Sequence, residues 1–139
     1  MSFDVFFIPS SDSLPEEEFD AGIEAAVALF GGVDDMGFPS TLEGYSFELF
    51  GSMFALRGWH DSMADLLFEV AQATSSFIVP AGTYDEPMRT PNNRGDAPGL
   101  DDVVLVSGPS DVADRIGPNF TGWTGYRGQV WRDPDADQP

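Results

Sequence analysis

The sequence predicts an α+β fold of the ferredoxin-like kind, an antiparallel four-stranded sheet with two helices on one face. The first observation is residues 45–57, YSFELFGSMFALR, where two alternating segments flank Gly51-Ser52, a loop suited to a type II′ turn. The second is an amphipathic helical pattern before this hairpin and another after it. The third is a strand-like segment at each end of this set, which completes the order β-α-β-β-α-β.

The hairpin determines which side chains share a face of the sheet. A turn at Gly51-Ser52 pairs Phe50 with Met53 and carries the register outward from there. Because successive side chains of a strand point to opposite faces, every second residue of the two strands points to the same side. The apolar residues on that side are Phe47, Leu49, Phe54 and Leu56. We expect the two helices to cover them.

The segment before the hairpin predicts a strand, a helix and a connection. Residues 2–9 form the strand, since apolar side chains fall on both of its faces. Ser13 with Glu16 is a capping-box pattern, and it begins a helix that Gly31-Gly32 ends. Residues 33–44 are rich in turn formers and predict a connecting segment.

The segment after the hairpin predicts the second helix and the fourth strand. Either Asp61 or Ser62 is suited to cap a helix that runs to about Thr74. Residues 76–80, SFIVP, form the strand that follows it.

Beyond residue 80 the sequence predicts an extension of the same domain. Residues 81–101 form a long loop, residues 103–106 (VVLV) a fifth strand, and Ser110 caps a short helix through Ile116. The predicted organisation is a single domain over 1–131, with its core in 2–80 and its extension in 81–131, and a disordered acidic tail over 132–139.

The second face of the sheet is also apolar. Phe6 and Ile8 of the first strand share it with Phe50, Met53 and Ala55 of the hairpin. A patch of this kind is seldom left exposed unless it is an interface. Three possibilities remain for what covers this face. They are the chain's own strand at 103–106 with the aromatic segment that follows it, a second copy of the chain, or a different partner.

The charge of the chain is strongly negative. Twenty-four Asp and Glu oppose six basic residues, all of them Arg, for a formal net charge of −18. Such a chain repels phosphate backbones, so no nucleic-acid partner is expected. Two explanations remain open: an acidic surface that attracts a basic protein, or adaptation to high salt or to a GC-rich genome. No apolar run approaches the ~20 residues of a membrane span, and the lack of Cys suits a cytoplasmic protein.

The sequence contains no strong catalytic, metal or cofactor motif. The nearest candidate is the junction at Arg57 to Asp61, where Arg57 and the single histidine, His60, are placed to bind an anion at a helix N-terminus. The plainer explanation is that Asp61 caps the helix and His60 is solvated. The acidic residues near 34–43 do not match the spacing of a calcium loop, so we expect neither a metal nor a cofactor.

These observations favour a non-enzymatic, acidic protein-binding module. Its most concrete form is an immunity-type inhibitor that neutralises a basic bacterial toxin through complementary charge. The acidic residues expected to contact such a partner are Asp34, Asp35, Glu43, Asp61, Asp65, Glu86, Asp101 and Asp102.

Two alternatives stay open. One is a dimeric ferredoxin-like enzyme or small-ligand-binding protein with a pocket at the open sheet face. The residues expected to line that pocket are Phe6, Phe50, Met53, Arg57, Trp59 and His60. The other is a protein whose acidity is only a halophilic adaptation.

Overall fold

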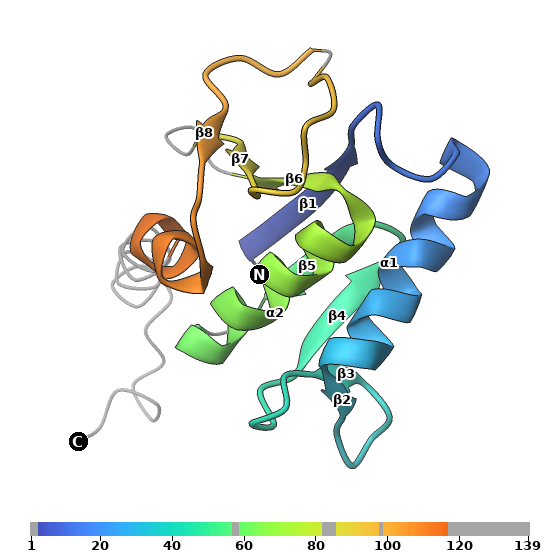
Figure 1. Cartoon of the computed structure of the whole chain (residues 1–139). Coiled ribbons are helices and arrows are strands. Elements are labelled where there is room, and N and C mark those ends of the chain that lie inside the picture. The colour runs from blue at the N-terminus through green and yellow to red at the C-terminus, as the bar shows by residue number, and fades with distance from the viewer. Residues whose placement is uncertain (1–2, 57–58, 82–85, 98, 117–139) are drawn as a thin grey trace.

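The fold is α+β, as the sequence predicts, and its sheet is larger than expected (Figure 1). The computed structural model describes residues 3–56, 59–81, 86–97 and 99–116. The labelled elements are β1 (Phe3–Pro9), α1 (Glu16–Phe30), β2 (Gly32–Val33), β3 (Pro39–Ser40), β4 (Phe47–Phe50), β5 (Met53–Leu56), α2 (Asp61–Thr74), β6 (Ser76–Pro80), β7 (Met88–Arg89) and β8 (Val104–Leu105). A further helix occupies residues 109–116.

Six strands form a mixed sheet in the order β4-β5-β1-β6-β7-β8. The central strand β1 pairs antiparallel with both β5 and β6, and β4 pairs antiparallel with β5. The strand β7 lies inside the segment predicted as a long loop, and β8 corresponds to the predicted strand at 103–106. Because β8 pairs parallel with β7, it lengthens the sheet at its edge, so this strand is not the cover of the second face, which was one of the three possibilities left open.

The β4–β5 hairpin has the predicted register. Phe50 pairs with Met53 and Phe47 with Leu56. Gly51 has a φ of +61°, the left-handed value that the first central position of a II′ turn requires. On the inner face, the ring of Phe54 stacks on that of Phe47 at 4.5 Å between centroids. The hairpin therefore delivers its aromatic face to the core, as the alternation of its sequence predicts.

The core lies between the sheet and the helices. Figure 1 shows α1 and α2 side by side across one face of the sheet. They bury Ile23 and Leu67 against Val5 and Phe7 of β1, all with no exposed surface. Burial of each such side chain contributes roughly 1.5–3 kcal/mol. The helix at 109–116 adds Val112 and Ile116 to the same core cluster.

The predicted N-terminal caps of α1 and of the C-terminal helix are wrong. The helix α1 begins at Glu16 after Pro15, with no side-chain cap, and the hydroxyl of Ser13 instead donates to the carbonyl of Ser75 at 2.8 Å. Ser75 ends α2 in the left-handed conformation. Its carbonyl accepts the Ser13 hydroxyl that was predicted to cap α1. The C-terminal helix begins one residue before Ser110.

The loop at 90–97 covers part of the second sheet face. The guanidinium of Arg89 lies 5.2 Å from the ring centroid of Phe77 and donates a hydrogen bond to the carbonyl of Gly95 at 2.8 Å. Phe77 is fully buried there, whereas Phe50, at the far end of the same face, is 57% exposed. The aromatic segment after residue 116, predicted as a further cover, and the tail at 132–139 lie outside the described residues.

Within the described part of the chain, no helix combines the length and the apolar character needed to cross a membrane.

Candidate functional site

A two-stranded ribbon, β2–β3, stands beside β4 at one edge of the main sheet. It lies within the segment predicted only as a connection, and Asp34 organises its turn. One carboxylate oxygen of Asp34 accepts hydrogen bonds from the amides of Met36 and Phe38 at 2.8 and 2.9 Å. The other oxygen accepts the hydroxyl of Ser46 at 2.7 Å. Asp34, predicted as a partner contact, therefore first holds the shape of the ribbon.

These hydrogen bonds act on the ionisation of Asp34. The hydroxyl of Ser46, followed by the amide of Phe38, lowers the pKa of the Asp34 carboxyl below its ordinary value. A lowered pKa means that the charged form is favoured by the folded ribbon. The resulting stabilisation is present above the unfolded-state pKa and is lost as the pH falls through the folded-state pKa.

Exposed apolar side chains gather around the ribbon. Among the described residues, nine large hydrophobic side chains are exposed, and six of them lie between residues 29 and 45. We call these six residues the ribbon surface: Leu29, Val33, Met36, Phe38, Leu42 and Tyr45. Single exposed hydrophobics are normal, but six within seventeen residues of the chain make this region the best candidate for an interaction site.

A groove adjoins the ribbon surface where the C-terminal end of α1, the turn at 41–43 and α2 meet. Its volume is about 510 Å³. Its walls are apolar except for three carboxylates and two hydroxyls. We call it the acidic groove, and its lining residues are Leu29, Phe30, Thr41, Leu42, Glu43, Ser62, Asp65, Leu66 and Glu69.

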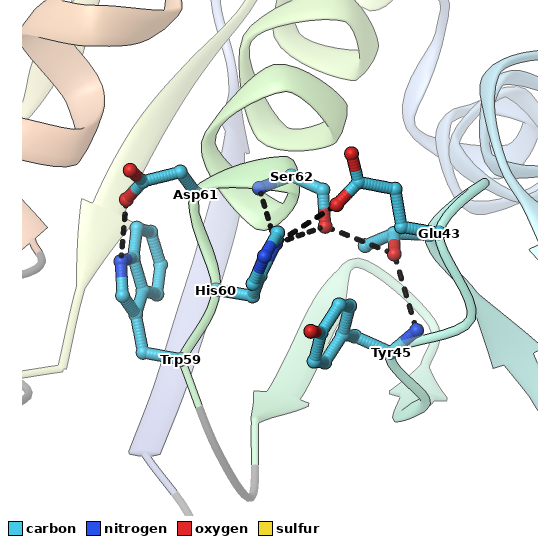
Figure 2. A network of polar contacts seen from close by, with 7 residues as sticks. Glu43, Tyr45, Trp59, His60, Asp61 and Ser62 are labelled. Atoms are coloured by element: carbon cyan, nitrogen blue, oxygen red, sulfur yellow. Dashed lines mark hydrogen bonds and ion pairs between the residues drawn. The ribbon is translucent and has the colours of Figure 1, made fainter.

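A polar network fixes one wall of this groove (Figure 2). His60 precedes α2, and its ring Nδ1 accepts a hydrogen bond from the backbone N–H of Ser62 at 3.1 Å. The imidazole thus caps the helix, and the prediction that Asp61 or Ser62 caps it is wrong. Asp61 instead accepts a hydrogen bond from the indole N–H of Trp59 at 3.3 Å.

The same network joins the turn at 41–45 to α2. The ring of Tyr45 stacks on that of His60 with centroids 4.0 Å apart, as Figure 2 shows. The hydroxyl of Thr41 accepts hydrogen bonds from the hydroxyl of Ser62 at 3.0 Å and from the amide of Tyr45 at 3.2 Å. The Oε2 atom of Glu43 lies 3.2 Å from His60 Nδ1. The ring caps the helix when Nδ1 holds a lone pair, and it donates a hydrogen bond to Glu43 when Nδ1 holds a proton.

The structure divides the predicted acidic contacts between two places. At one place, Glu43 and Asp65 line the acidic groove, Asp34 and Asp35 belong to the adjoining ribbon turn, and Asp61 is the first residue of α2. The remaining three, Glu86, Asp101 and Asp102, lie beside β7 and β8, where the opposite edge of the sheet is formed. The sequence alone gave no reason to separate them.

Some residues of the groove were not among the site residues predicted from the sequence. Glu69 follows Asp65 by one helical turn, so the i, i+4 spacing on α2 was a usable signal for it. Leu29 and Leu42 had no comparable signal, because each is an ordinary apolar residue whose exposure only the tertiary structure reveals.

The residues predicted to line a ligand pocket also fall into two sets. Phe6 and Met53 pair with one another and share the open sheet face with Phe50, near the Gly51-Ser52 turn. Trp59 and His60 follow the other end of β5, and Trp59 packs against the core on the helix side. Arg57 lies outside the described residues. The five described residues of this prediction are therefore not brought into one pocket.

Comparison of the chain with protein-family models, with curated proteins and with solved structures finds no match. Within the described residues, no cluster of three or more His, Asp or Glu is arranged to hold a metal ion.

Proposed function

We propose that this protein is a non-enzymatic binding module for a basic protein, most concretely an immunity-type inhibitor that neutralises a basic bacterial toxin in the cytoplasm. The observation that carries this proposal is the acidic groove beside the ribbon surface, where exposed leucines adjoin Glu43, Asp65 and Glu69. Apolar side chains at the centre of an interface and charges around them are the usual arrangement of a protein–protein contact.

The two parts of this surface have different roles in binding. Burial of the apolar side chains supplies affinity, at roughly 25 cal/mol per Å² of surface removed from water. The carboxylates, on a chain with a net charge of −18, attract a cationic partner from a distance and repel acidic ones. The proposed partner is therefore basic, with an apolar patch of its own.

We further propose that the inner part of the molecule is a ferredoxin-like unit. Its support is the antiparallel order β4-β5-β1-β6, together with α1 after β1 and α2 between β5 and β6 in the chain. On this proposal, β7 and β8 are additions to one edge of the unit, and the ribbon is an insertion beside the other.

The test is an association measurement. The protein is used to capture partners from its own host's lysate, the captured protein is identified and purified, and the mass of the complex is measured by light scattering. We expect a 1:1 complex with one basic protein whose association rate falls about tenfold or more between low and high salt, because screening removes the long-range attraction. An association rate that is equally fast at high salt would contradict electrostatic steering.

Adaptation to high salt makes a different prediction and needs its own control. If the acidity only served solvent adaptation, the free energy of unfolding of the protein alone would rise strongly with molar KCl. The binding proposal expects folding without any requirement for salt, and urea denaturation in low and high KCl separates the two.

The open end of the second sheet face supports a second candidate, a homodimer with a small-ligand pocket. Phe50 is exposed there beside the partly exposed Phe6 and Met53. A dimer on this face would cover them. The substitution Phe50→Asp would then convert a dimer to a monomer in light scattering, and a wild-type monomer would exclude this candidate.

A further inference from the structure

We infer that the acidic groove receives a cationic amphipathic segment of the partner, with one apolar side chain inside the groove and Lys or Arg on either side of it. The inference rests on the proposed function and deepens it, because it names the place of contact and the chemistry of the contacting segment. Three features of the described residues support it: the shape of the groove, the position of its carboxylates, and the field of the helix end beside it.

The shape of the groove suits one large apolar side chain. Its volume of about 510 Å³ lies within the range of ~300–1,000 Å³ typical of ligand pockets. Leu66 is buried at the α2 wall, whereas Leu29 and Leu42 are 73% and 79% exposed on the other two walls. An inserted Leu, Phe or Met would contact all three and remove the two exposed leucines from water.

The carboxylates lie where the flanking cations would be. Asp65 and Glu69 are one turn apart on α2, so they border the groove on the same helix face. Glu43 borders it from the turn on another wall, with its Oε2 atom 3.2 Å from Nδ1 of His60. No Lys or Arg lines the groove among the described residues. A segment with cations on either side of its apolar anchor matches this arrangement.

The end of α1 adds to the negative field of the groove. Leu29 and Phe30 belong to the last turn of α1, and no basic residue compensates the partial negative charge of the carbonyls there. The field therefore adds to that of the carboxylates. It also disfavours a second copy of this chain as the occupant, because each copy carries a net charge of −18.

A defined peptide tests the inference without knowledge of the natural partner. The probe is a peptide of about 18 residues made of Leu and Lys in the i, i+3, i+4 pattern of an amphipathic helix. The control is a peptide of the same composition whose scrambled order spreads Leu around the helix. Binding is measured by calorimetry at physiological salt and mapped by amide chemical shifts. We expect shifts at residues 29–30, 41–43 and 62–69, and affinity about tenfold above that of the control.

Matched variants separate the groove from general charge attraction. Asp65→Asn with Glu69→Gln and Asp101→Asn with Asp102→Asn raise the net charge equally, at the groove and at the opposite sheet edge. We expect the groove pair to weaken binding about fivefold or more and the distant pair less than about twofold, since screening limits the distant charges. Equal weakening by both pairs would overturn the groove as the site and leave a basic partner possible.

A second pair of variants tests the apolar contact. Leu42→Ser removes an exposed groove side chain, and Leu105→Ser removes an exposed side chain of β8 at the opposite edge. Both positions lie on the surface, so both variants are expected to fold. We expect only Leu42→Ser to weaken the peptide. Failure of the wild-type protein to bind the peptide would also overturn the inference, whereas the proposed function fails only if the captured partner is not basic or associates independently of salt.

Discussion

The two hairpins of this protein use their apolar residues in opposite ways. The β4–β5 hairpin turns Phe47, Phe54 and Leu56 into the core, where almost none of their surface is exposed. The β2–β3 ribbon is shorter and leaves Val33, Met36 and Phe38 in water around a turn that Asp34 holds in place. The first arrangement stabilises the fold. The second contributes little to folding, and under the proposed function it is the surface that a partner covers.

The exposed ribbon is held in place by hydrogen bonds although its apolar side chains lie in water. The ribbon turn is held by three hydrogen bonds to one carboxylate, and the adjoining turn is held by the His60 network. An apolar surface that is already ordered loses less conformational entropy on binding than a mobile one. The order of this exposed region is therefore consistent with a docking surface.

The largest predicted effect breaks the buried hairpin. Phe54→Ala removes a ring that stacks on Phe47 and makes an edge contact with Phe7 at 4.9 Å between ring centroids. We expect it to lower the free energy of unfolding by about 3–5 kcal/mol. Phe50→Ala, four residues earlier but 57% exposed, is the matched control and should change it by less than about 0.5 kcal/mol. Urea denaturation measures both. Comparable losses of unfolding free energy in the two variants would contradict the assignment of Phe54 to the core face and Phe50 to the exposed face.

The buried hairpin could be predicted because its information is local. The alternation of residues 47–56 and the Gly51-Ser52 loop determine register, turn and inner face together, and the structure has all three. The C-terminal end of α2 and the bounds of β6 were predicted for the same reason. Short-range patterns therefore gave the α+β class.

The regions that could not be predicted depend on distant contacts. The strand β7 is two residues long and exists because β6 and β8 lie on either side of it. His60 caps α2 although histidine is an uncommon cap, because the ring of Tyr45 stacks on it from another part of the chain. The acidic groove combines three separate segments, so the acidic residues of the sequence could be listed as candidates but not grouped.

The next largest effect is expected at His60, which joins the core helix α2 to the turn beside the ribbon. His60→Ala removes the acceptor of the Ser62 amide and is expected to lower the free energy of unfolding by about 1 kcal/mol. His60→Asn supplies an oxygen that caps a helix well and is expected to recover most of that loss. Thermal and urea denaturation near neutral pH measure both. An Asn variant no more stable than the Ala variant would show that the cap is not what His60 contributes.

The smallest predicted effect is confined to the ribbon turn. Because the Ser46 hydroxyl is the main cause of the lowered pKa of Asp34, Ser46→Ala should bring that pKa back toward its ordinary value. The folded ribbon then loses the contribution of ionised Asp34 at a higher pH than in the wild type. A carboxyl titration by NMR gives the pKa, and amide exchange at Met36 and Phe38 reports the turn. An unchanged pKa of Asp34 would show that the Ser46 hydroxyl does not lower it.

The most direct test of the central claim is the footprint of a captured basic partner on this protein. Hydrogen–deuterium exchange of the protein alone and in the complex compares three surfaces in one measurement: the ribbon surface with the acidic groove, the open sheet face at Phe50, and the β7–β8 edge. We expect new protection in residues 29–45 and along the first two turns of α2, with the other two surfaces unchanged. Protection confined to the sheet face or to the β7–β8 edge would contradict it.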